Sequence, residues 1–181
     1  VTEIAYVNGS VLVAGLSNEE FSSNLRTIPF PFKSDVQSSN IEIYHGSHGR
    51  YETQAPVRTF VPYTIKNKQY IVAAYTCTPL VTIPMSDLKA GAKVKGSTIA
   101  ELGAHNRPID MIAYKKDNHD YILMANSARG VIKVTADHLE TYKPITAPTE
   151  SAGVPYQTIS GLTGVMRLTS LDDSKALIRS E

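Results

Sequence analysis

The chain repeats a short apolar pattern several times along its 181 residues. Three stretches align when written beneath one another, and each has a tyrosine in the same place: Tyr6, Tyr63 and Tyr114. Between the second and third copies the offset stays at 51 residues as far as Leu88 and Leu139. A fourth, weaker copy begins near Leu162. Because a few short strands cannot bury both of their faces alone, such repeats must stack against one another.

A period of about 50 to 55 residues, made of short strands, predicts an all-β fold of the β-propeller type, with one four-stranded antiparallel blade per repeat. The expected blade units are 1–54, 55–106 and 107–160, followed by a partial blade over 161–181. Since a ring normally needs about four to eight blades, these roughly 3.5 blades are expected to be part of a larger ring. The remaining blades would lie in the same polypeptide or in another chain, unless the blade count is wrong.

The expected strands follow from turn residues and apolar runs. The first hairpin joins Glu3–Val7 to Val11–Gly15 through Asn8-Gly9, which supplies the two positive φ angles of a type I′ turn. Longer polar turns are expected at 66–68 and 115–120. The third strands are expected at Leu25–Phe30, Leu80–Met85 and Val131–Thr135. The outer fourth strands are expected at Asn40–Tyr44 and Val94–Leu102, and the final hairpin joins Leu162–Leu168 to Ala176–Arg179. The recurring tyrosines and the methionines Met111, Met124 and Met166 are expected in the core between blades.

Composition excludes several classes of function. A formal net charge of +1 gives no electrostatic case for a nucleic-acid partner, and no apolar run approaches the roughly 20 residues of a membrane span. The single cysteine, Cys77, cannot form an internal disulfide. Because many bacterial propellers are exported, we expect a periplasmic or secreted protein, although a single cysteine is equally compatible with the cytoplasm.

The third copy, residues 107–134, resembles the repeat of NHL/YVTN-type propellers. Those repeats begin with proline, continue through an apolar strand and a turn, and give a second strand that ends in a small polar residue. The matching positions are Pro108, Ile112, Tyr121, Met124, Asn126 and Val131. The resemblance implies the fold and no particular activity, because neither lactonase carboxylates nor a quinone site can be placed on this sequence.

In a propeller, the loops from an outer strand to the next inner strand emerge on the same face as the loops between second and third strands. That face surrounds the mouth of the channel, where binding sites usually lie. The residues expected to bind a ligand there are His48, Arg50, Glu52, Arg107, Asn126 and Arg129. Four arginines, Arg58 included, would form an anion site if they converged. Alternatively, they form salt bridges between blades with Glu52, Glu101 and Asp110.

Histidines are concentrated in the segment 44–52, where glycines allow a close approach of the backbone. His45, His48 and His105 are candidate ligands of a transition-metal ion such as Zn, Cu or Fe. Alternatively, these side chains bond the loop backbone, or His48 acts as a general acid or base. Cys77 is either a nucleophile with a nearby histidine as its base or a small buried side chain, as its alignment with Ala128 suggests.

Three functions follow from these features. The first is a binding or interaction module that presents its loop-rich face to a small molecule or a protein partner. The second is a periplasmic propeller enzyme, a metal-dependent hydrolase or oxidoreductase with a histidine-based site. The third is a purely structural segment of a larger ring. The cofactor is unknown apart from the possible transition-metal ion.

Overall fold

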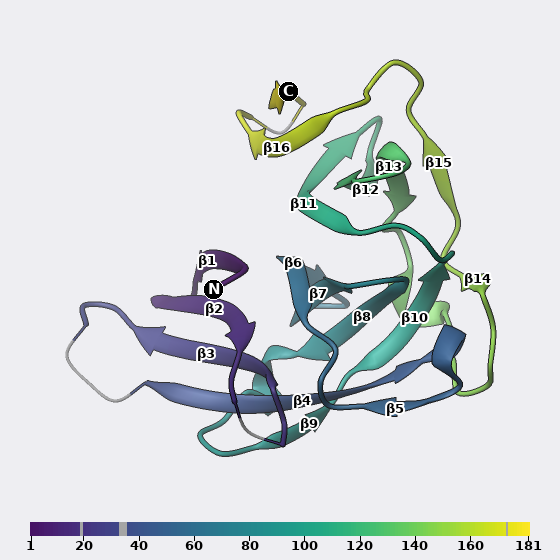
Figure 1. Cartoon of the computed structure of the whole chain (residues 1–181). Coiled ribbons are helices and arrows are strands. Elements are labelled where there is room, and N and C mark those ends of the chain that lie inside the picture. The colour runs from purple at the N-terminus through teal and green to yellow at the C-terminus, as the bar shows by residue number, and fades with distance from the viewer. Residues whose placement is uncertain (19, 33–35, 173) are drawn as a thin grey trace.

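The structure is a computed structural model that describes residues 1–181 except 19, 33–35 and 173. It is an all-β protein made of several antiparallel sheets, which confirms the predicted fold class at that level (Figure 1). Within the described residues, helical structure is limited to three 3-10 turns: η1 (Gly46–His48), η2 (Met85–Asp87) and η3 (Leu139–Thr141). No helix in this part of the chain is long and apolar enough to cross a membrane.

Three sheets begin with strands that follow one another in chain order. The first contains β1 (Glu3–Val7), β2 (Ser10–Leu16), β3 (Ser23–Pro29), β4 (Gln37–His45) and β5 (Arg50–Glu52), and β9 (Lys93–Lys95) also pairs with β4. The second contains β6 (Val57–Ile65), β7 (Lys68–Tyr75), β8 (Pro79–Pro84), β10 (Ser97–Leu102) and β14 (Ser151–Gly153). The third contains β11 (Pro108–Lys116), β12 (His119–Asn126), β13 (Gly130–Thr135) and β15 (Tyr156–Thr158). The hairpin of β16 (Val165–Ser170) and β17 (Ala176–Ser180) follows.

The first hairpin of each of these three sheets has the same tight turn. Asn8-Gly9 links β1 to β2 with φ angles of 50° and 71°, as predicted. Lys66-Asn67 and Asp117-Asn118 also have positive φ at both residues, so the longer turns expected there are wrong. Asparagine and aspartate tolerate the left-handed region better than most residues, and a two-residue turn of this kind matches the twist of the strands it joins.

The strand expected over Val94–Leu102 is in fact two strands that belong to different sheets. β9 runs parallel to β4 of the first sheet, whereas β10 pairs with β8 of the second. Gly96 lies at the division, and a Cβ atom there would lie 2.5 Å from Val81 Cγ1. A side chain at this position would therefore force Val81 to move, so glycine favours the close passage from one sheet to the next.

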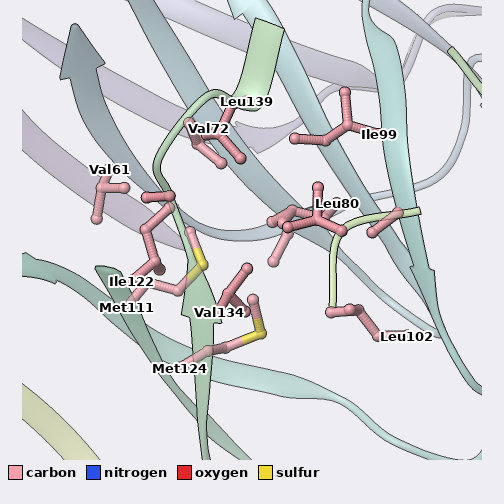
Figure 2. Packing of buried hydrophobic residues seen from close by; sticks show 14 of the residues in the cluster. Val61, Val72, Leu80, Ile99, Leu102, Met111, Ile122, Met124, Val134 and Leu139 are labelled. Carbon is pink, nitrogen blue, oxygen red and sulfur yellow. The ribbon is translucent and has the colours of Figure 1, made fainter. Parts of the chain in front are cut away.

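The sheets pack face to face in chain order, so that β6 contacts β1 on one side and β11 on the other (Figure 1). Apolar residues fill each junction. Leu12, Leu25 and Ile43 meet Phe60 and Ile71 between the first two sheets. The second junction is shown in Figure 2, where the labelled residues include Val61, Val72, Leu80, Met111, Ile122 and Met124. A smaller cluster joins the third sheet to Val165 and Leu168 of β16.

The recurring tyrosines do not share one environment. Tyr63 lies partly buried against the second junction, and its hydroxyl donates to Asp120 Oδ2 at 3.0 Å. Tyr114 stacks on Tyr121 of its own sheet at a ring-centroid distance of 5.3 Å. Tyr6 is 64% exposed, so its predicted place in the core is wrong. Of the three methionines expected in the core, Met111 and Met124 are buried as predicted, whereas Met166 is only half-buried.

Candidate functional site

Loops from the three sheets gather at one end of the stack. They are residues 46–56 between β4 and β6, 76–78 between β7 and β8, 103–107 between β10 and β11, and 127–129 between β12 and β13. Together they enclose most of a pocket of about 560 Å³. Its lining residues are Ser47, His48, Thr76, Cys77, Ala104, His105, Asn106, Arg107, Ser127 and Glu150.

Glu52 contacts both histidines at the end of β4 and in the loop after it. β5 folds back on β4 and brings Glu52 opposite Ile43 and Arg50 opposite His45. One carboxylate oxygen, Oε2, lies 2.8 Å from His45 Nδ1, and the other, Oε1, lies 2.7 Å from His48 Nδ1. Arg50 Nε also donates to Oε1 at 3.1 Å. The two imidazole rings lie against each other, with centroids 3.8 Å apart.

The environment favours the charged form of Glu52. Burial acts to raise the pKa of its carboxyl, but hydrogen bonds from His45, His48 and Arg50 outweigh burial and hold that pKa below its usual value. An ionised carboxylate can only accept hydrogen bonds. Each ring therefore carries a proton on Nδ1, and in the neutral ring Nε2 is the nitrogen with a free lone pair.

A second carboxylate, Glu101 of β10, lies beneath the same loop and is 1% exposed. Its Oε1 accepts the Gly46 N–H at 2.5 Å, and its Oε2 accepts the Thr78 hydroxyl. Burial raises the pKa of the Glu101 carboxyl, because the bonds from Thr78 and Gly46 only partly offset the loss of water. Thr78 Oγ1 also lies 3.4 Å from His45 Nε2, so the two carboxylates flank His45.

Three of these side chains form a set that could hold a metal ion. His45, His48 and Cys77 each offer one ligand atom, and these atoms all lie within 4.8 Å of one another. His105, the third ligand expected from the sequence, lines the same pocket but is outside this group. Cys77 occupies a turn with a φ of 77°. Its alignment with Ala128 had pointed to packing, and only the fold brings it beside the histidines.

The remaining residues expected to bind a ligand lie at different depths. The side chain of Arg107 lines the pocket, whereas Arg50 and Glu52 line a neighbouring hollow of about 450 Å³. Asn126 is buried and accepts from Asn106 Nδ2 at 2.7 Å. The Arg129 guanidinium donates to three backbone carbonyls at the end of β10 and in the loop after it: Leu102, Gly103 and Ala104. Asn126 and Arg129 therefore support the loops behind the pocket.

The expected salt bridges between blades are not the rule at this end of the molecule. Arg50 pairs with Glu52 of its own strand, and Glu101 is bonded by Thr78 and Gly46 rather than by an arginine. Asp110 lies 3.8 Å from Arg167 of β16, which is an ion pair between adjacent sheets.

Comparison of the chain with family models, with curated proteins and with solved structures finds no match.

Proposed function

We propose that the stacked sheets are blades of a β-propeller and that the chain is a binding module whose ligand site lies on the loop-rich face. The sequence repeat, its resemblance to NHL/YVTN-type blades and the face-to-face order of the sheets around β1, β6 and β11 support this proposal. The further blades that a ring requires would come from the same polypeptide or from another chain. Electron microscopy should reveal a ring with a central channel, and an open stack with no channel would contradict the propeller.

The observation that carries the binding function is the composition of the pocket. Loops from three sheets contribute imidazole, hydroxyl, amide and guanidinium groups to the lining of this one pocket. Arg107 and His105 are exposed there, and no described carboxylate forms an ion pair with the Arg107 guanidinium. Arginine recognises carboxylate and phosphate groups through a planar pair of donors. The proposed ligand is therefore a small polar molecule that carries an anionic group.

Titration of isotope-labelled protein with succinate and with inorganic phosphate, followed by NMR, tests this site. We expect saturable shifts at the amides of residues 103–107 and 127–129 for at least one of the two probes. The shifts should be lost in Arg107→Ala and retained in Arg26→Ala, since Arg26 is an exposed arginine of β3, away from these loops. Shifts that do not saturate, or that persist in Arg107→Ala, would contradict an anion site at Arg107.

A second candidate function, a metal-dependent hydrolase or oxidoreductase, is favoured by one observation. Glu52 orients two histidines whose Nε2 atoms remain available, beside a buried carboxylate whose pKa is raised. Paired groups with opposite pKa shifts are typical of acid–base sites. Hydrolysis of an activated acetate ester above the buffer rate, lost in His48→Ala, is the expected outcome for a hydrolase, and equal rates in both proteins would contradict that activity.

A further inference from the structure

We infer that His45, His48 and Cys77 bind one thiophilic divalent transition-metal ion, of which Zn²⁺ is the representative case, and that the open side of this ion faces the pocket. The inference deepens the proposed function of the same pocket. It rests on the positions of these side chains and not on the closure of a propeller ring.

The first argument is the direction of the two imidazoles. Both Nδ1 atoms lie within hydrogen-bond distance of the same carboxylate, and the ring planes are tilted by 36° with centroids 3.8 Å apart. Both Nε2 atoms therefore lie on the side away from Glu52. The Thr78 hydroxyl has one proton and directs it to Glu101, so the Nε2 lone pair of His45 is not consumed by that neighbour. Neutral imidazole with a free ring nitrogen is the form that binds metals.

The second argument is Glu52 itself. Metal-binding histidines almost always donate their other ring N–H to a carboxylate, a carbonyl or water, which holds the tautomer and the ring orientation. Here a single carboxylate holds both rings, at 2.8 Å and 2.7 Å. It is itself held by Arg50 Nε and is mostly enclosed, with 14% of its side chain exposed. Histidines that were only solvated by water would not need an enclosed carboxylate to hold both of their rings.

The third argument is the identity and placement of the sulfur donor. Cys77 belongs to the turn between β7 and β8, on the second sheet, whereas His45 ends β4 of the first sheet and His48 lies in η1 of the loop that follows. The left-handed backbone of Cys77 is uncommon for a residue with a side chain. Its sulfur completes a group whose donor atoms are mutually within 4.8 Å. Thiolate with two imidazoles suits zinc or copper and not the oxygen-preferring ions Mg²⁺ or Ca²⁺.

The fourth argument is access. His48 and Cys77 line the pocket while His45 is buried behind them, so an ion held by all three would lie at the pocket wall. Three protein ligands leave a fourth position of a tetrahedral zinc site open. That position suits an oxygen donor such as water or a carboxylate, and Arg107 and His105 line the same pocket. Its ligand would then be a small molecule with an anionic oxygen.

Cobalt(II) titration of chelator-treated protein tests the inference, because Co²⁺ reports zinc sites by absorption. We expect one equivalent to produce visible bands typical of a tetrahedral site, together with a thiolate-to-cobalt charge-transfer band. Cys77→Ser should remove the charge-transfer band, and His48→Ala should weaken binding. The matched control is His119→Ala. His119 Nδ1 also lies 2.7 Å from a carboxylate, that of Asp137, but this exposed pair is outside the three-residue group, so its loss should leave the cobalt spectrum unchanged.

Glu52→Gln separates the role of the carboxylate that holds the two rings from that of the metal ligands. Loss of such a partner typically lowers metal affinity by about 10- to 100-fold, whereas the charge-transfer band should persist at saturating cobalt. Circular dichroism of each metal-free variant shows whether it is folded, and His48 is exposed enough for its alanine variant to fold. Absence of the cobalt bands in the folded wild type, or an unchanged spectrum in Cys77→Ser, would overturn the inference.

Two further measurements distinguish a failure of the metal inference from a failure of the proposed binding function. Phosphate and succinate titrations of the chelator-treated protein report the anion site at Arg107 alone. If these respond while cobalt does not bind, the metal site is wrong and the pocket function stands. If Cys77 instead reacts rapidly with iodoacetamide in a manner that depends on His48 and is not slowed by zinc, the pair is a thiol–imidazole nucleophile and the metal inference is wrong.

Discussion

Two loops lead from one sheet to the next in equivalent places, yet they differ in length and in content. Residues 103–107 run directly from β10 to β11. Residues 46–56 contain η1 and then β5, which turns back along β4 before β6 begins. The short loop is held by a guanidinium from outside it, Arg129. The long loop is held by its own carboxylate, Glu52, which contacts His45 and His48.

This difference shows which part of a repeated fold can carry functional side chains. The strands of each sheet must bury apolar side chains against the next sheet, so their sequence is constrained by the stack. A connecting loop at the end of the stack has no such constraint, and an insertion there can fold back on the sheet. The additional residues of the long loop provide His48 and Glu52, and both of these side chains contribute to the candidate site.

The largest expected difference between the two loops is in the stability that a histidine provides. His45→Ala should lower the free energy of unfolding by about 2–4 kcal/mol, because it opens a cavity and removes a partner of Glu52. His105→Ala, an exposed residue of the short loop, should change it by less than about 0.5 kcal/mol. Urea unfolding of both variants measures this. Similar values for the two would remove the distinction between the loops.

Next in size is the support of the short loop. Arg129→Ala should cost about 2 kcal/mol of unfolding free energy, because three carbonyls lose a charged donor. The Arg129 guanidinium also packs on Gly103, where a Cβ atom would lie 2.7 Å from Nη2. Arg107→Ala is the control, since this side chain is exposed in the same loop. Equal melting temperatures for the two variants would show that the short loop does not depend on Arg129.

The smallest expected effect is a pair of opposite pH dependences in the long-loop site. The pKa of Glu52 is lowered from 4.5, so its stabilising contribution is present above pH 4.5 and is lost as the pH falls through its folded value. The pKa of Glu101 is raised from 4.5, so the folded state favours its protonated form and loses stability as the pH rises above 4.5.

Unfolding free energies measured from pH 3 to pH 8 test these signs. Relative to wild type, Glu101→Gln should gain stability as the pH rises above about 4.5, and Glu52→Gln should lose less stability as the pH falls below about that value. Parallel pH profiles for all three proteins would mean that the two carboxylates are not held in different environments.

Local sequence predicted the parts of the fold that local physics controls. Asn8-Gly9 predicts a two-residue turn whatever surrounds it, and the bounds of β1 agree with the prediction. The turns at Lys66-Asn67 and Asp117-Asn118 were expected to be longer, because neither contains the glycine that marks such turns most clearly. The division of 94–102 at Gly96 could not be predicted, since it depends on the position of Val81 in another strand.

The candidate site shows the same limit. The spacing of His45, His48 and Glu52 within eight residues drew attention to a loop that lines the pocket, but it did not indicate that one carboxylate would hold both rings. That contact requires β5 to pair backwards on β4. Arg129 looked like a ligand-binding residue because its carbonyl partners are not visible in a sequence. Whether the site binds an anion or a metal stays a prediction.

The sequence by itself determined the repeat, the all-β class and the loops that carry unusual residues, because apolar periodicity and turn chemistry act over a few residues. Only the tertiary structure decided which side chains meet. Cys77 lies 32 residues from His45 in the chain, and its donor atom reaches the histidines because the second sheet packs on the first. Contacts of this kind are consequences of burying two sheet faces together, and no local pattern encodes them.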